Sequence, residues 1–182
     1  MGNPHTILFG LGIGIFMVAG WLLYESRQYG EMPRVLGVSV CEEYVQQTNA
    51  DLGEIIDQYY APLHDMSIGP VTLRASIAQT PVARQQGLSN TPCLPRDVVK
   101  LFVFDSSNTW GFWMKDMNYS IDIIWVDESG RVVDWVEAVS PETYPESFRP
   151  REPARYVIET IPNFVTTHSV GTSTMVQLPD GV

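Results

Sequence analysis

The sequence predicts a mainly β protein: a compact antiparallel-rich β-sandwich or barrel with one or two short helices, preceded by an N-terminal transmembrane helix. Three features support this fold class. Short apolar runs alternate with polar residues at period two, turn residues separate these runs, and a long uncharged stretch lies near the start of the chain. Many short strands joined by turns are typical of sandwiches and barrels.

The chain divides into four parts by composition. Residues 1–24 form a membrane anchor or a signal peptide, residues 25–67 a polar and partly helical connector, residues 68–178 the β-rich globular domain, and residues 179–182 a tail. A chain of 182 residues is long enough for one well-packed domain with such appendages, and too short for two domains of ordinary size.

The predicted anchor is the uncharged stretch ILFGLGIGIFMVAGWLLY, residues 7–24. As a helix rising ~1.5 Å per residue it would span ~27 Å, enough for the hydrocarbon core of a bilayer. A basic start and a small-x-small cleavage site would mark a signal peptide, and neither is evident, so an uncleaved anchor is favoured. Arg27 and Arg34 follow the stretch and no Lys or Arg precedes it, which taken alone would keep the remaining chain cytoplasmic.

The first elements of the connector and the domain follow from their spacing. Apolar residues at helical spacing over residues 52–59 predict a helix, and the period-two pattern of residues 71–77 predicts a strand. Thr80 suits an N-cap, Pro81 suits the first helical position, and Gly87 is placed to end the short helix between them. An apolar strand at residues 101–104 follows this helix.

The aromatic stretch at residues 110–115 predicts the next strand, because aromatic side chains suit a pleated and half-buried surface. Side chains alternate along a strand. Phe112 and Met114 are therefore expected on one face, and Trp113 and Lys115 on the other.

The strongest local signal is a β-hairpin over residues 120–136. Residues 120–126 alternate, residues 127–130 are turn formers that include a glycine, and a β-branched run follows them. Asp122 falls among apolar side chains of the first strand. Because an isolated carboxylate is costly to bury, we expect it at a sheet edge or with a hydrogen-bonding or cationic partner. The cationic candidates are Lys115, Arg84 and Arg155.

The rest of the chain contains an irregular loop, two strands and a short turn or helix. Residues 140–153 contain four prolines and predict the loop. Residues 155–160 and 174–178 predict strands, and residues 163–169 a short turn or helix.

Composition excludes several classes of function. A net charge of −10 and a pI near 4.6 argue against nucleic acid as a partner, since phosphate binding needs a basic face. His5, His64 and His168 are isolated, so no metal site is predicted. No phosphate-binding glycine loop or Gly-x-Ser-x-Gly motif is present, and no cofactor is expected.

Five short motifs occur in a fixed order along the chain. They are RQQGL at residues 84–88, LFVF at 101–104, FWMKDM at 112–117, IDII at 121–124 and ARYVIE at 154–159. In content and order they resemble the bacterial and archaeal family called domain of unknown function 192, over roughly residues 68–178. The resemblance implies a compact β-rich domain that often follows a signal peptide or membrane anchor and has no established activity.

The candidate ligand-binding residues are Arg84, Trp113, Lys115, Asp122, Arg155 and Glu159. Trp113 would stack on a ring of a ligand while Lys115 holds an anion. The alternative for this pair is a core tryptophan beside a lysine whose stem lies along apolar surface. The two arginines would bind a carboxylate, or else neutralise the two acidic residues inside the domain.

We expect a membrane-anchored extracytoplasmic domain that binds a ligand or serves as an accessory module of the cell envelope. Catalysis is not expected, because no nucleophile, metal set or cofactor motif is visible. The expected partners are the membrane, through residues 7–24, and a small molecule, glycan or envelope protein. The alternative is a cell-envelope glycan hydrolase that uses two of Asp116, Asp122 and Glu159 as its carboxylate pair.

The chain contains two cysteines, Cys41 and Cys93. In an exported domain they are candidates for a disulfide that ties the connector to the globular domain. A Cα separation beyond ~7 Å would exclude that bond.

Overall fold

The structure is a computed structural model, and it describes residues 40–182. The predicted membrane anchor, residues 1–24, and the first part of the connector, residues 25–39, lie outside the described residues. Within the described part, no helix is both long and apolar enough to cross a membrane.

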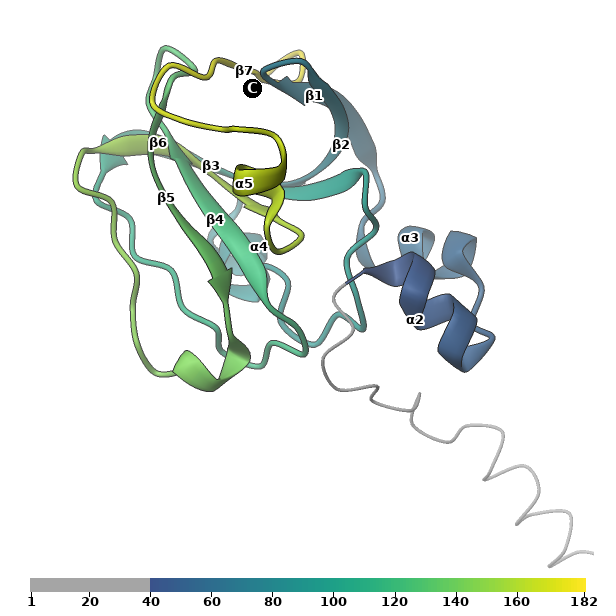
Figure 1. Cartoon of the computed structure of the whole chain (residues 1–182). Coiled ribbons are helices and arrows are strands. Elements are labelled where there is room, and N and C mark those ends of the chain that lie inside the picture. The colour runs from purple at the N-terminus through teal and green to yellow at the C-terminus, as the bar shows by residue number, and fades with distance from the viewer. Residues whose placement is uncertain (1–39) are drawn as a thin grey trace, which may run out of the picture. The chain divides into compact units, whose positions relative to one another are not determined.

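One curled sheet of seven strands forms the body of the described chain (Figure 1). The strands are β1 (Leu63–Ile68), β2 (Val71–Ala78), β3 (Val98–Asn108), β4 (Ile121–Val126), β5 (Val132–Val139), β6 (Ala154–Thr160) and β7 (Val176–Gln177). In space they follow the order β5-β4-β6-β3-β2-β1-β7. Neighbouring strands pair antiparallel except for β2 and β3, which run parallel. The predicted mainly β fold is therefore confirmed, as a mixed sheet.

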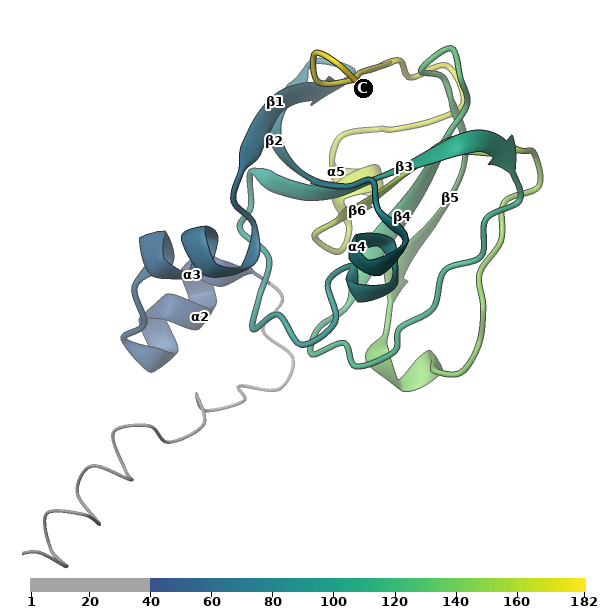
Figure 2. The same ribbon diagram turned by 180° about the vertical axis from the view of Figure 1, so that it is seen from behind.

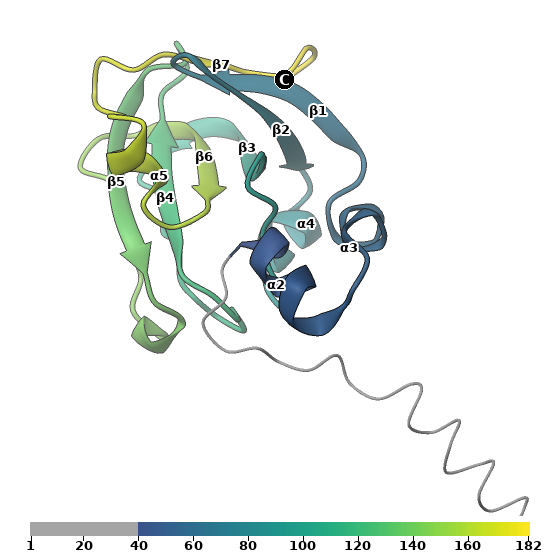
Figure 3. The same ribbon diagram turned by 45° about the vertical axis from the view of Figure 1, so that its right-hand side comes forward.

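The sheet curls into a half-barrel, so that its edge strands β5 and β7 approach each other at one end (Figure 3). There the N–H of Val132 donates to the carbonyl of Thr174 at 3.1 Å, and the N–H of Val176 donates to the carbonyl of Gly130 at 2.7 Å. Gly130 has a φ of +83°, and a Cβ on it would lie only 2.7 Å from the carbonyl oxygen of Val176. Only glycine fits at this position.

Helix α4 (Pro81–Gln86) connects β2 to β3 and explains why these two strands are parallel, since parallel neighbours need a crossover connection. Figure 2 shows α4 lying against the sheet. The Thr80 hydroxyl accepts a hydrogen bond from the N–H of Ala83 at 3.1 Å, and the helix ends at Gly87 with a φ of +50°. The helix predicted from these capping residues is confirmed.

Strands β4 and β5 form the predicted hairpin, with Ile121 opposite Val139. In the turn between them, the Asp127 carboxylate accepts hydrogen bonds from the N–H groups of Ser129 and Arg131. Every residue of β4 is buried, which places this strand in the middle of the core.

Residues 110–115 do not form the predicted strand. Phe112 exchanges two backbone hydrogen bonds with Phe148, at 2.9 and 2.8 Å, and this is an isolated bridge. The facing segment is the proline-rich loop, where Pro145 and Pro150 have no N–H to donate, so a longer ladder cannot form. The stretch is instead fastened to the core by Trp125, whose indole N–H donates to the carbonyl of Trp110 at 3.0 Å.

Strand β1, Leu63–Ile68, was not predicted and lies mostly inside the predicted connector. Its apolar pattern is weak because His64 and Asp65 are polar and exposed. Strand β3 is longer than the predicted segment 101–104. Strand β7 covers two residues of the predicted segment 174–178. The predicted turn or helix near residue 163 is present as helix α5 (Phe164–Thr167).

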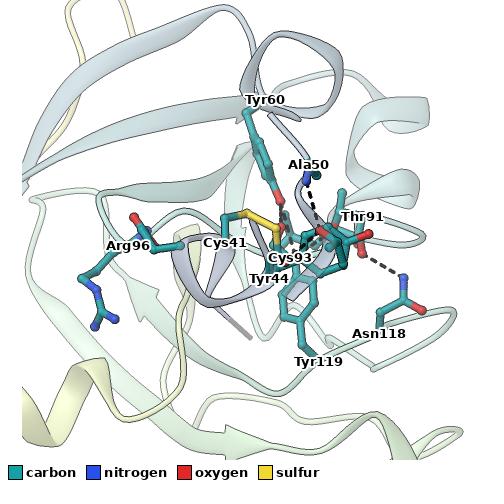
Figure 4. Close-up of a disulfide and its surroundings, with 12 residues drawn as sticks. Cys41, Tyr44, Ala50, Tyr60, Thr91, Cys93, Arg96, Asn118 and Tyr119 are labelled. Carbon is teal, nitrogen blue, oxygen red and sulfur yellow. Dashed lines mark hydrogen bonds between the residues drawn. A yellow bond between two sulfur atoms is a disulfide. The ribbon is translucent and has the colours of Figure 1, made fainter. Parts of the chain in front are cut away.

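Helices α2 (Cys41–Thr48) and α3 (Leu52–Tyr59) precede the sheet, and a disulfide between Cys41 and Cys93 ties them to it (Figure 4). The two Cα atoms are 4.9 Å apart, within the range a disulfide requires. The Tyr60 hydroxyl donates to the carbonyl of Cys93 beside the bond. The two cysteines are 52 positions apart in the sequence, and a native disulfide ordinarily contributes roughly 2 to 4 kcal/mol to stability.

Candidate functional site

A cavity of about 260 Å³ lies beside the C-terminal end of α4. Its walls come from α4 and the residues after it, from β3, from the stretch 110–117 and from β6. The lining residues discussed below are Arg84, Gly87, Phe102, Phe104, Trp110, Phe112, Trp113 and Glu159.

Aromatic rings form the apolar walls of the cavity. Phe102 and Phe104 are two residues apart on β3 and therefore face the same side of the sheet. The ring of Phe112 meets that of Phe102 edge to face at 4.8 Å, and Trp110 stacks on Phe104 at 4.1 Å. Trp113 is half exposed and contacts the ring of Tyr144. The walls of the cavity are thus largely aromatic, and Trp113 is the most exposed of these rings.

Gly87, directly after α4, lines the cavity next to Phe102 and the carboxyl group of Glu159. A Cβ on Gly87 would lie 3.1 Å from the ring of Phe102 and 3.8 Å from Oε2 of Glu159. Its positive φ is also a conformation that residues with side chains rarely adopt. The glycine that ends α4 is therefore needed for the shape of the cavity as well as for the helix end.

Among residues 40–182, Glu159 on β6 is the one acidic side chain that lines the cavity, and it is 4% exposed. Its Oε2 has no hydrogen-bond partner among the described residues. Burial raises the pKa of Glu159 to about 8, and the positive charge of Lys100 offsets part of that rise. A buried acid without a partner is unusual in a folded protein and marks this position as a candidate site.

Lys100 lies opposite Glu159 in the pairing of β3 with β6. Its ammonium group donates to the Ser76 hydroxyl at 3.1 Å, and Lys100 lines a separate hollow together with Ser76 and Ala83. Within residues 40–182 it forms no ion pair with Glu159 closer than 4.0 Å. Burial lowers the pKa of Lys100, and Glu159 counteracts that shift. The carboxyl group of Glu159 thus has a nearby charge but no direct counter-ion.

The two predicted arginines have different positions. Arg84 lines the cavity: its guanidinium lies 5.0 Å from the centre of the Phe104 ring and donates to the carbonyls of Gln79 and Val103 at 2.5 and 2.8 Å. Arg155 does not line the cavity and donates to the carbonyl of Phe104 at 3.3 Å. Neither forms an ion pair with Asp122 or Glu159 within the described chain.

The structure therefore brings three of the six candidate residues to the cavity, Arg84, Trp113 and Glu159. Lys115 is exposed in a turn next to Asp116, and neither of them lines the cavity. The expected alternation of Trp113 and Lys115 with buried Phe112 and Met114 is nevertheless observed.

Asp122 is fully buried. The prediction that a Lys or Arg side chain pairs with it is wrong. Its carboxylate accepts hydrogen bonds from the backbone N–H groups of Ala138, Asn163 and Val165, at 2.7, 2.9 and 2.9 Å. Burial raises the pKa of Asp122, and these three bonds offset part of the rise. Backbone amides can replace a cation here because they point directly at the oxygens, and the carboxylate fastens β5 and α5 to β4.

Asp122 and Glu159 project from opposite faces of the sheet. Asp122 pairs with Thr160 in the register of β4 and β6, whereas Glu159 pairs with Ile123. Neighbouring residues of a strand face opposite sides, so the two carboxyl groups do not share a site. Within the described residues, no group of acidic, His and Cys side chains could hold a metal ion.

Sequence reasoning identified Trp113 but missed the other ring walls, Phe102, Phe104, Trp110 and Phe112, and it missed Gly87 as part of the site. The spacing of Phe102 and Phe104 on one strand is a signal that could have indicated a common aromatic face. The position of Gly87 next to Glu159 has no such signal, because the two residues are far apart in the sequence and meet only through the fold.

A family model for domain of unknown function 192 (DUF192), described as "Uncharacterized ACR", matches residues 64–178. No curated protein matches the chain. A putative transcription regulator from Sinorhizobium meliloti 1021 has a similar solved structure, with a TM-score of 0.61 and 21% identity over 65% of this chain and 95% of that chain. A protein of unknown function from Novosphingobium aromaticivorans DSM 12444 has a TM-score of 0.60 and 18% identity, over 64% and 85% of the two chains. At these identities the likeness concerns the fold alone.

Proposed function

The chain belongs to the uncharacterised DUF192 family, and we propose that this member is a ligand-binding module that takes a small molecule into the cavity beside α4. The observation that supports this most is the unpartnered Oε2 of buried Glu159. Buried polar groups are ordinarily hydrogen-bonded, and an acid with a strongly raised pKa in a cavity is a common mark of a functional site. A bound ligand would supply the missing partner.

Binding without turnover is favoured over cleavage of a glycan. The glycosidase mechanism needs two carboxyl groups on either side of one bond, and Asp122 faces away from Glu159. Asp116 does not line the cavity either. A volume of about 260 Å³ is below the range of roughly 300 to 1,000 Å³ typical of pockets for drug-sized ligands, which supports a small molecule.

A fragment screen against the full chain tests this proposal. We expect at least one small neutral, cationic or anionic fragment to bind saturably and unchanged, reported by the fluorescence of Trp110 and Trp113, which line the cavity. Trp113→Ala should weaken that binding about two- to tenfold, because an aromatic contact contributes roughly 0.5 to 1.5 kcal/mol.

The matched control is Met175→Ala, which removes a side chain of similar exposure, 52% against 50%, outside the cavity. It should leave the affinity unchanged. The proposal fails if no fragment binds, or if both variants weaken binding equally. Release of a product that disappears in Glu159→Gln would replace binding with catalysis.

We further propose that the domain is membrane-tethered and extracytoplasmic. The uncharged stretch of residues 7–24 supports the tether. The disulfide between Cys41 and Cys93 supports the location, since disulfides persist mainly in oxidising compartments.

Thiol trapping in cells tests the location. Full chain quenched with acid and alkylated under denaturing conditions should show both cysteines blocked, and two reactive thiols only after reduction. A chain that lacks residues 1–24 should remain in the cytoplasm with both thiols reactive. Two free thiols in the full chain would contradict an extracytoplasmic location.

A further inference from the structure

We propose that the ligand of the cavity carries an ammonium group, which binds Oε2 of Glu159, joined to a small apolar or aromatic group that the ring walls hold. The inference rests on the proposed binding function and specifies the chemical class of its ligand.

The position of Oε2 favours a cationic partner that donates hydrogen bonds. The oxygen is buried and unpartnered, and a Cβ on Gly87 would lie 3.8 Å from it, in ordinary van der Waals contact. The ammonium group of Lys100 is hydrogen-bonded to Ser76 and lies beyond ion-pair distance. An ionised carboxylate here therefore lacks both a donor and a direct counter-ion, and a buried charge needs both. A ligand ammonium supplies the two together.

The ring walls of the cavity also favour a cationic ligand. Aromatic faces attract cations, and the guanidinium of Arg84 already lies over the Phe104 ring at 5.0 Å. Phe102, Trp110 and Trp113 add further ring surface around the same space. An anionic ligand would meet repulsion from the ring faces and from the Glu159 carboxylate. The chain's net charge of −10 also favours the approach of cations.

Lys100, Tyr60 and Tyr119 interact electrostatically with Glu159, and Arg84 lines the same cavity. Arg84 and Lys100 are positive, and both oppose a cationic ligand, although each is hydrogen-bonded elsewhere. Burial raises the pKa of Tyr60 to about 12 and raises that of Tyr119 as well, so both hydroxyls stay neutral. The pKa of Glu159 is about 8. A proton and the ligand ammonium therefore compete for the same carboxylate near neutral pH.

Three probes with one ring and different charge test the ligand class: benzylamine, benzyl alcohol and benzoate. Benzylamine should bind the full chain, release a proton on binding, and gain about 50-fold in affinity from pH 6 to pH 8. A pKa of about 8 leaves about 1% of the carboxyl ionised at the lower pH and about half at the higher one. The alcohol and benzoate should bind at least about tenfold more weakly than the amine at pH 8.

Three variants test whether the Glu159 carboxylate binds the ammonium group or only stabilises the fold. Glu159→Gln keeps the shape of the side chain and should lower benzylamine affinity at pH 8 at least about tenfold and abolish its pH dependence. Arg84→Met should act in the opposite direction and strengthen amine binding, because it removes a repulsive charge from the cavity. Glu146→Gln, at an exposed glutamate outside the cavity, should change neither quantity.

Failure of the ligand class is distinguishable from failure of the binding function. Benzyl alcohol or benzoate binding as tightly as the amine, with loss in Trp113→Ala, would overturn the ammonium class and leave the cavity a binding site. Benzylamine affinity unchanged in Glu159→Gln would overturn it too. If benzylamine does not bind at all, the class is wrong, and the fragment screen shows whether the binding function fails with it.

Discussion

Asp122→Ala is expected to lower the free energy of unfolding by about 4 to 6 kcal/mol. The substitution leaves the N–H groups of Ala138, Asn163 and Val165 without an acceptor, and each buried donor left unpaired costs roughly 1 to 3 kcal/mol. Ala138 and Asn163 also have φ values of 47° and 64°, a conformation that is unfavourable for residues other than glycine and that the carboxylate helps to hold. Denaturant unfolding, with the slope m held equal, measures the change.

Two further variants test this expectation, one as a control and one with an intermediate effect. Asp105→Ala removes an exposed carboxylate from β3 and should change stability by less than about 0.5 kcal/mol. Asp122→Asn keeps one acceptor oxygen but turns an NH₂ group toward the backbone donors, so its effect should lie between the other two. A loss below about 1 kcal/mol in Asp122→Ala would show that the three hydrogen bonds do not hold β5 and α5 in place.

Glu159→Gln is expected to make the protein more stable than the wild type at pH 9 and no different at pH 4. The folded-state pKa of Glu159 is about 8, above its ordinary value of 4.5, so between these values the folded state binds the proton more tightly than the unfolded state does. The stability from this group is fully present below about pH 4.5 and is lost as the pH rises through about 8. The full loss is on the order of 4 to 5 kcal/mol, and glutamine, which does not titrate, avoids it.

Unfolding free energies measured from pH 4 to pH 9 for both proteins check this result. The difference between Glu159→Gln and the wild type should grow between about pH 4.5 and pH 8 and level off above that, while Glu146→Gln should follow the wild-type curve. Parallel curves for Glu159→Gln and the wild type would show that Glu159 is ionised and compensated in the folded protein. That outcome would also remove the main support for a ligand at Oε2.

Part of the candidate site was accessible from the sequence. The alternation of residues 112–115 correctly separated buried Phe112 and Met114 from exposed Lys115 and half-exposed Trp113, although no strand forms there. Arg84, Trp113 and Glu159 were singled out by their motifs, and all three line the cavity. The sequence could not show that Lys115 and Arg155 lie outside it, because a period-two pattern assigns a face but not what lies opposite that face.

By itself, the sequence determined the elements whose causes are local. The β4–β5 hairpin depends on turn residues set between β-branched runs, and helix α4 depends on Thr80, Pro81 and Gly87. Only the tertiary structure decided what these elements meet. The three amides that bind Asp122 come from residues 16 to 43 positions away, and Lys100 faces Glu159 through the pairing of β3 with β6. Such contacts depend on strand order and register, which are set by packing of the whole sheet. The residues next to each contact in the sequence therefore do not predict it.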